Sequence, residues 1–273
     1  MTLNCHGTLI DLSTPKVMGI LNITPDSFFD GGKYNDEESI VLQVEKMLTE
    51  GATFIDVGAY SSRPGAKALT EAEELSRIIP IVTLLIDHFP DILLSIDTFR
   101  SRVAENCLAA GAAMINDITA GTKDDNMLAL IANYKVPYIM MHMRGTPQTM
   151  KQHTVYENLL TDILYFFSER MAAAKALGIC DIIIDPGFGF AKTLDQNYEL
   201  LQHLDLFQTF NCPVLVGLSR KSMIYKALGT DPSRALNGTT ALNTFALNNG
   251  ANILRVHDVA EAMECIRLMR YLI

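Results

Sequence analysis

The sequence predicts a (β/α)₈ barrel, in which eight parallel strands alternate with helices along the chain. Apolar runs short enough to be buried strands recur eight times, and longer segments with helical spacing separate them. Near-continuous hydrophobic strands indicate a sheet that is covered on both faces, and repeated right-handed βα units close into a barrel. An open doubly wound sheet is the alternative, but no GxGxxG sequence opens the first crossover.

The elements follow in order along the chain. Strands are expected at 17–21, 54–58, 92–96, 113–117, 138–143, 181–185, 214–218 and 252–256. Helices are expected between them, for example at 37–51, 70–86, 157–178 and 234–250, and several of these segments end on glycine. The stretch NCHGTLIDLS before the first strand predicts a short hairpin or plug. No Pro/Ser-rich linker interrupts the chain, so we expect one domain over 1–273.

Composition argues against several classes of partner. The chain has 22 Lys+Arg against 31 Asp+Glu, a net charge of −9, without any basic block, which argues against nucleic acid and anionic membranes. Five dispersed cysteines form no CxxC pair, and their odd number is typical of reduced thiols in the cytosol. No basic leader and no apolar run of about 20 residues is present. We expect a cytoplasmic protein with a small-molecule partner.

Polar side chains stand at the C-terminal ends of all the expected strands, where barrels of this class hold their active sites. These residues are Asn22, Asp56, Asp97, Asn116, Asp117, His142, Asp185, Lys221, Arg255 and His257. Any single one could be a helix cap or a turn former. Together they predict a rim that binds a ligand with both donors and acceptors.

The rim residues divide into two chemical groups. Asp97, Asn116 and Asp185 offer the carboxylate and amide groups that an amino-pyrimidine-like base needs. Basic residues that favour a phosphate-like anion form the second group: Arg63, Lys221, Arg255 and His257. Arg255 alone could instead pair with a helix carboxylate, and His142, among methionines, is more typical of a packing residue.

No metal-binding motif is present, but Mg²⁺ could enter with a diphosphate and needs only one or two protein oxygens. Asn22 is the candidate.

The strand-end segments resemble those of dihydropteroate synthase, in the same order and over nearly the whole chain. The matching segments are VMGILNITPDSFFDGG (17–32), FIDVGAYSSRPGA (54–66), SIDTFR (95–100), INDITAG (115–121), MMHMRGTPQTM (140–150), IIIDPGFGFAKT (183–193), VGLSRKSMI (216–224) and RVHDV (255–259). The resemblance implies condensation of hydroxymethyl-dihydropterin diphosphate with 4-aminobenzoate, giving dihydropteroate and diphosphate in folate synthesis. It also implies inhibition by sulfonamides and a homodimer.

The resemblance also assigns the site residue by residue. It implies a pterin pocket of Asp97, Asn116, Asp185 and Lys221. It implies a diphosphate site of Asn22, Arg63, Arg255 and His257, with Mg²⁺ at Asn22. For 4-aminobenzoate it implies Phe28, Ser62, Pro64, Phe190, Lys221 and Ser222. Catalysis would rest on Asp97, Asp185, Lys221 and Arg63.

Two features of the loops qualify this assignment. Many relatives have G-E-S-T-R-P where this chain has AYSSRP at 59–64, so Tyr60 replaces a carboxylate while Ser62 keeps a hydroxyl. Phe28, Asp26 and Asp30 follow the first strand in a segment with Pro25 and two glycines, and we expect a lid over 4-aminobenzoate there.

For the chemistry, we expect diphosphate to leave before the amine attacks. Two rival functions remain open: a pterin-binding methyltransferase barrel that acts with a corrinoid protein, and a silent pterin-binding paralogue.

Overall fold

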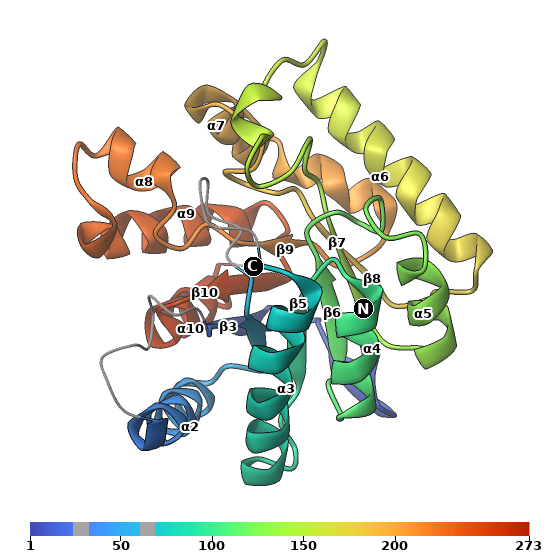
Figure 1. Ribbon diagram of the computed structural model, residues 1–273. Helices are drawn as coiled ribbons and strands as arrows, with labels where there is room; N and C mark the ends of the chain where they lie inside the picture. The colour runs from blue at the N-terminus through green and yellow to red at the C-terminus, as the bar shows by residue number, and fades with distance from the viewer. Residues whose placement is uncertain (24–32, 61–68, 273) are drawn as a thin grey trace.

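The computed structural model, which describes residues 1–23, 33–60 and 69–272, is a barrel of eight parallel strands surrounded by helices (Figure 1). The strands are β3 (Lys16–Asn22), β4 (Phe54–Gly58), β5 (Leu94–Asp97), β6 (Met114–Asp117), β7 (Tyr138–Met141), β8 (Ile182–Asp185), β9 (Leu215–Val216) and β10 (Ile253–Val256). Their order around the sheet is β8-β7-β6-β5-β4-β3-β10-β9. A parallel bridge between Ile184 and Val214 closes the ring, and Ile184 N donates to Pro213 O at 3.0 Å.

The helices alternate with the strands and cover the outside of the barrel (Figure 1). They are α2 (Lys33–Glu50), α3 (Glu71–His88), α4 (Ser101–Ala109), α5 (Met127–Tyr134), α6 (Leu159–Ala176), α7 (Leu194–Gln202), α8 (Ser222–Ala227), α9 (Leu236–Asn248) and α10 (Val259–Met269). Within the described ranges there are also 3₁₀ segments at η1 (Met150–Gln152), η2 (Leu204–Phe210) and η3 (Pro232–Arg234). No helix in the described ranges is long and apolar enough to cross a membrane.

Alternation along each strand divides the core into two parts. Val17, Ile55 and Ile96 point outward into the large cluster under the helices. Their neighbours point into the barrel, where a first layer is apolar: Met18, Phe54, Met114, Ile139, Ile183, Leu215 and Ile253. Two residues further along four of these strands, the same inward face presents Asp56, Asn116, Asp185 and Arg255. The barrel is therefore apolar at its N-terminal end and polar at its C-terminal rim.

A hairpin closes the apolar end. β1 (Thr2–Cys5) pairs with β2 (Thr8–Asp11) in antiparallel register, and His6 and Gly7 make the turn with positive φ angles of 51° and 86°. Leu3, Cys5 and Leu12 are buried in the same cluster as the first inward layer. The hairpin is tied to the barrel by His6, whose Nε2 lies 2.7 Å from Ala112 O. This confirms the plug expected from the sequence.

The expected barrel is confirmed, with small differences at the strand ends. The largest is at β9, which covers only two of the five residues expected at 214–218. Pro213 lacks the N–H of a ladder residue, and the chain turns at 218–221, where Lys221 N donates to Leu218 O at 3.1 Å.

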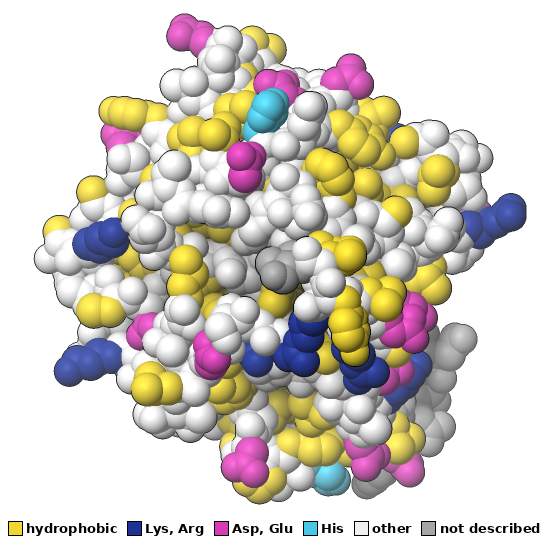
Figure 2. Space-filling model, turned by 180° about the vertical axis from the view of Figure 1, so that it is seen from behind, with side chains coloured by type: hydrophobic (Ala, Val, Ile, Leu, Met, Phe, Trp, Pro, Cys, Tyr) yellow, Lys and Arg dark blue, Asp and Glu magenta, His cyan; other side chains and the backbone are white. Residues whose placement is uncertain are grey.

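On the face turned away in Figure 1, acidic, basic and apolar side chains are interspersed (Figure 2).

Candidate active site

A charged cluster from four strands fills the rim end of the barrel. Arg255, on β10, donates from Nε to Asp56 Oδ2 at 2.6 Å and from Nη2 to Asp97 Oδ2 at 3.2 Å. Asn116 Nδ2 donates to the same Asp56 oxygen at 3.1 Å. The hydrogen-bonded pairs lie 60 to 199 positions apart in the sequence, and the closed sheet brings them together. Arg255 therefore pairs with strand carboxylates, not with the helix carboxylate that was the sequence alternative.

Asp56 and Asp97 share one arginine in this cluster, and the pKa of Asp97 is shifted. Burial, reinforced by the charge of Asp56, raises the pKa of Asp97 to about 7 although Arg255 opposes the shift. Burial alone would lower the pKa of Arg255, but Asp56 and Asp97 hold it above its ordinary value. Asp56 Oδ1 is buried and has no hydrogen-bond partner among the described residues. The cluster thus retains an acceptor that a bound donor group could use.

Asp185 and Lys221 form the second part of the rim. Asp185 ends β8, and its Oδ1 accepts from Gly187 N at 2.8 Å. Lys221 precedes α8, and its Nζ donates to Phe188 O at 2.5 Å and lies 5.0 Å from the centroid of the Phe190 ring. Burial raises the pKa of Asp185 and lowers that of Lys221 to about 8, and each charge partly stabilises the other.

The end of β10 is linked to the loop after β9. Ser219 Oγ lies 3.0 Å from His257 Nδ1 and accepts from His257 N at 3.1 Å, while the His257 side chain stays exposed. Arg220 holds Asp258 through Nε at 2.8 Å and Nη2 at 2.7 Å. This bidentate pair fixes the loop from which α8 starts, with Ser222 as its first residue.

Asn22 lies at the last position of β3, half-buried, in register with Gly58 of β4. Asp97 packs against Gly58, because a Cβ there would lie 3.3 Å from the Asp97 Cβ. Asn22 is therefore next to the charged cluster. Four predicted site residues fall on 24–32 and 61–68, outside the described residues: Phe28, Ser62, Arg63 and Pro64. Asp26 and Asp30 of the proposed lid also lie outside the described residues.

Two strand-end residues that the sequence placed near the rim lie away from the cluster. Asp117 has the opposite parity to Asn116 and points outward, where its carboxylate accepts from Tyr138 Oη at 2.6 Å and from the Thr119 and Gly121 amides at 2.7 Å. His142 is 2 % exposed and packs edge-on against Phe166, with ring centroids 5.0 Å apart. Burial holds the pKa of His142 well below its ordinary value.

Sequence reasoning placed Asp56 at the rim but gave it no role in the site, and it did not identify Ser219 or Lys192. A role for Asp56 could have been inferred, because a carboxylate in the middle of the buried run FIDVG needs a partner. Ser219 gave no signal, since a serine after a strand is an ordinary turn residue. Lys192 is 8 % exposed, which its place in a polar stretch after GFGF did not indicate.

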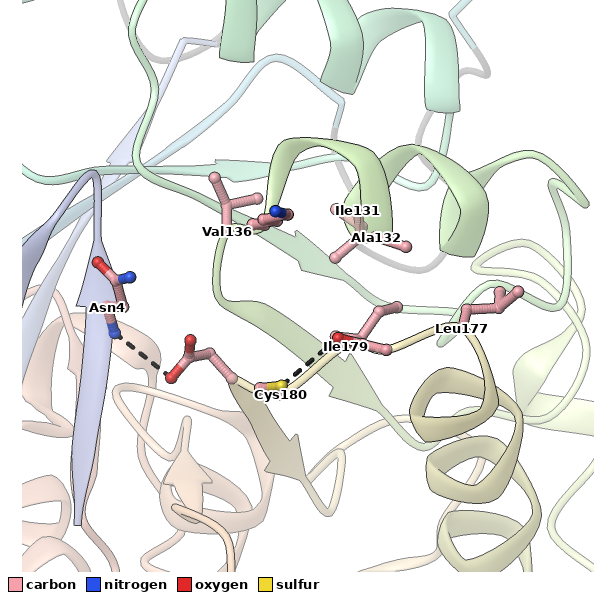
Figure 3. Close-up of a pocket in the computed structure, with 10 residues that line it drawn as sticks. Asn4, Ile131, Ala132, Val136, Leu177, Ile179 and Cys180 are labelled. Carbon is pink, nitrogen blue, oxygen red and sulfur yellow. Dashed lines mark hydrogen bonds between the residues drawn. The ribbon is translucent and has the colours of Figure 1, made fainter.

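A separate surface pocket of about 450 Å³ lies at the other end of the barrel (Figure 3). Val136 and Asp181, which precede β7 and β8, line it together with Asn4 of the hairpin and Cys180. Asn4 N donates to Asp181 Oδ1 at 3.3 Å, and Cys180 Sγ is directed at Gly178 O at 3.4 Å. These polar groups engage one another, and the pocket contains no set of groups comparable to the rim.

Comparison with known proteins agrees with this geometry. Residues 18–257 match the family model described as pterin binding enzyme. Dihydropteroate synthase of Escherichia coli K12 is 42 % identical over 271 residues, covering 98 % of this chain and 95 % of that protein.

Two solved structures are also similar. The Yersinia pestis dihydropteroate synthase in a sulfonamide drug complex superposes with a TM-score of 0.93 at 42 % identity, covering 100 % of this chain and 99 % of that one. The Xanthomonas albilineans enzyme in complex with 7,8-dihydropteroate gives a TM-score of 0.89 at 36 % identity, covering 100 % and 98 %. Together with the barrel fold and the rim cluster, these matches show that the chain belongs to the dihydropteroate synthases, a family of pterin-binding enzymes.

Proposed function

We propose that this chain condenses (7,8-dihydropterin-6-yl)methyl diphosphate with 4-aminobenzoate to give 7,8-dihydropteroate and diphosphate. The observation that best supports the proposal is the rim cluster, in which acids and an amide face one another beside Lys221 and Arg255. The relative from Xanthomonas albilineans with bound 7,8-dihydropteroate supports the same product.

The pterin would be held edge-on by Asp97, Asn116 and Asp185, whose oxygens accept hydrogen bonds from ring N–H and amine groups. Asp56 would act beside them in two ways. Its Oδ2 holds Arg255 and Asn116, so Arg255 keeps a carboxylate partner when Asp97 turns to the substrate. Its buried Oδ1 offers one further acceptor.

The reaction would begin with loss of diphosphate. The bond between the exocyclic methylene carbon and the diphosphate oxygen breaks, both electrons leave with the diphosphate, and the positive charge spreads into the electron-rich dihydropterin. When they are ionised, the side chains of Asp97 and Asp185 would stabilise that cation. The neutral aryl amine then forms the C–N bond, and its extra proton passes to water or to the departing diphosphate.

Diphosphate would be bound at the end of β3 and beyond β10. Asn22 and His257 stand at these positions, and Arg63 would complete the set with Arg255. No group of three or more His, Cys, Asp or Glu in the described ranges could hold a metal ion by itself. A single amide oxygen from Asn22 still fits Mg²⁺ that enters with a diphosphate, because phosphate oxygens and waters supply the other ligands. Bound Mg²⁺ would offset the negative charge on the leaving group.

The second substrate would lie against Phe190, with Lys221 and the start of α8 at Ser222 nearby. Phe28, Ser62 and Pro64 would complete this part of the site. The Yersinia pestis relative has been solved with a sulfonamide, and we propose that sulfonamides compete with 4-aminobenzoate here too.

One assay tests the function. Purified protein is incubated with Mg²⁺, the pterin diphosphate and 4-aminobenzoate, and dihydropteroate is detected by chromatography. We expect product from the wild type and from Asp91→Asn, an exposed acid before β5, but little from Asp185→Asn. Folded wild-type protein that makes no product would refute the assignment.

The order of steps has its own test. In single turnovers without 4-aminobenzoate, rapid quenching should still detect diphosphate release. If release strictly requires 4-aminobenzoate, the displacement is concerted.

We also propose a cytoplasmic homodimer. Burial raises the pKa of Cys5 and Cys107 to about 12 and that of Cys212 to about 11, which suits unreactive reduced thiols. Large apolar side chains on the packed pair α9 and α10, Phe245 at 42 % and Leu268 at 67 % exposure, could support a subunit contact. Analytical ultracentrifugation should give about twice the mass of one 30.2 kDa chain.

A further inference from the structure

A second lysine lies buried behind the rim. Lys192 is 8 % exposed, and its ammonium group has three neighbours within hydrogen-bond distance: Gly187 O at 2.9 Å, Phe190 O at 3.1 Å and His142 Nδ1 at 3.1 Å. An ammonium group has three donors, so each has an acceptor in this arrangement. A buried charge is retained at high cost unless it is fully partnered.

The turn that Lys192 holds is pressed against the end of β7. Gly187 and Gly189 have φ angles of 73° and 83°, in the left-handed region that favours glycine. A Cβ at Gly187 would lie 2.1 Å from His142 O, so the backbone approaches more closely than any side chain permits. The turn leaves its carbonyls directed inward, and Lys192 binds two of them.

A third carbonyl of the same turn, Phe188 O, accepts from Lys221 at 2.5 Å. The turn from Gly187 to Phe190 is therefore bound by two lysines, Lys192 from the core and Lys221 at the rim. Asn197 adds a contact, because its Oδ1 accepts from Gly189 N at 2.6 Å. The result is a fixed Phe190 ring, 5.0 Å from Lys221 Nζ.

We propose that Lys192 is a positioning residue for the 4-aminobenzoate half of the site: it holds the Gly187–Phe190 turn, and through the turn it fixes the Phe190 ring. The proposal rests on the function proposed above. Lys192 itself touches neither substrate. Its effect is transmitted by backbone carbonyls, so it should act on the second substrate more than on the pterin.

The electrostatic surroundings agree with this role. Besides His142, the charged groups that act on Lys192 are Asp185, Lys221 and Arg144. Burial lowers the pKa of Lys192 to about 7, and burial together with Lys192 and Arg144 lowers that of His142. A neutral His142 can accept at Nδ1, which places its proton on Nε2.

The first test is Lys192→Met, which keeps the length of the side chain and removes the donors. We expect the KM for 4-aminobenzoate to rise about tenfold while the KM for the pterin diphosphate changes less than about twofold, because the turn would be misplaced by a fraction of an ångström. Lys175→Met, an exposed lysine in the last turn of α6, should leave both constants unchanged. If both KM values rise together, or only the melting temperature falls, Lys192 is merely structural and the proposal is wrong.

A double-mutant cycle makes the test independent of general destabilisation. Phe190→Leu removes the ring that the turn is proposed to position. If Lys192 acts through that ring, adding Lys192→Met to Phe190→Leu should raise the KM for 4-aminobenzoate much less than tenfold. Fully additive effects would overturn the proposal. Should Lys192→Met not fold, Lys192→Gln, which keeps two donors, replaces it in the same cycle.

A spectroscopic measurement needs no activity. In wild-type protein the ¹⁵N shifts of His142 should show an unprotonated Nδ1 and a protonated Nε2 from pH 6 to pH 8, and Lys192→Met should shift the Nδ1 signal. Protonated Nδ1 in the wild type would overturn the contact on which the proposal depends. A wild type that shows the expected shifts but makes no dihydropteroate would instead refute the proposed function.

Discussion

The two ends of the barrel interior are built on the same strands and have opposite chemistry. At the N-terminal end, Met18, Phe54 and Ile183 pack against the hairpin and are fully buried. Two positions further along the strands, about 6–7 Å away, the same inward face presents Asp56 and Asp185. The comparison shows that one layer of side chains separates the part that stabilises the barrel from the part that we propose binds substrate.

The physical reason is the environment at each end. The hairpin excludes water from the lower layer, so apolar side chains gain free energy there by burial. The upper layer holds charged groups that only partly neutralise one another. Burial still raises the pKa of Asp97 and lowers the pKa of Lys221. Such groups cost stability without a ligand, and a ligand that pairs with them recovers part of that cost.

The largest expected effect comes from removing charge at the rim. Asp185→Asn and Lys221→Ala should each lower kcat/KM by about 10²–10⁴-fold, because they remove groups that face the reacting pterin. The melting temperature should change by less than about 5 °C, since neither residue belongs to an apolar cluster. Steady-state kinetics and calorimetry measure the two quantities. A fall in melting temperature well beyond 5 °C together with the loss of kcat/KM would mean that the upper layer is structural too.

A substitution at the N-terminal end of the barrel should affect stability instead of activity. Leu3→Ala in the hairpin should lower the free energy of unfolding by about 2–4 kcal/mol, because Leu3 is 1 % exposed in the lower layer. Activity per folded molecule should be unchanged. Leu9→Ala in the same hairpin, at a side chain that is 69 % exposed, is the matched control and should cost less than about 0.5 kcal/mol in urea titrations. A loss of kcat in Leu3→Ala at full folding would contradict the separation of the two ends.

A smaller effect concerns pH. The pKa of Asp97 is about 7 in the folded chain and near 3.8 when unfolded, so between these values the folded state holds a proton that the unfolded state has lost. The contribution of Asp97 to stability therefore falls as pH rises from about 4 to 7, and Asp97→Asn should remove roughly 1–2 kcal/mol of stability loss over this range.

The control is Asp11→Asn at the opposite end. Hydrogen bonds from Ser13 place the pKa of Asp11 below its ordinary value, so Asp11 is ionised in both states above pH 5. Urea titrations at pH 5, 6 and 7 give the free energy of unfolding at each pH. Its change with pH should be the same in Asp11→Asn as in the wild type. If it is also unchanged in Asp97→Asn, Asp97 is not protonated in the folded rim.

The smallest effect is expected between the loops. Tyr60 Oη accepts from Gln148 Nε2 at 2.8 Å and its ring meets Phe99 edge-on, with centroids 5.4 Å apart. Tyr60→Phe removes the exposed hydrogen bond and keeps the ring contact, so the KM for 4-aminobenzoate should change by about twofold or less. Tyr60→Ala removes both, and a larger change there would show that the ring contact matters more. If Tyr60→Phe and Tyr60→Ala change the KM equally, the hydrogen bond to Gln148 accounts for the effect.

The strands and most of the rim could be predicted from the sequence, because apolar runs end at polar residues and parallel strands end at the same side of the sheet. Asp97, Asn116, Asp185 and Arg255 are brought together in this way. Asp117 was expected at the rim but faces outward, since one residue along a strand reverses the direction of the side chain. The pairing of Arg255 with Asp56, 199 positions away, depends on which strands become neighbours when the ring closes.

Local hydrophobic period and side-chain type predict the alternation of elements, the plug and the kind of chemistry at each strand end. The folded barrel was needed to show which charges share a partner, that Lys192 is buried behind the rim, and that Ser219 reaches His257. Those contacts depend on barrel closure and on turns with positive φ angles, such as Gly187 and Gly189, which bring backbone carbonyls to within bonding distance of two lysines. Distances across a closed barrel are set by all the strands together, and no single segment specifies them.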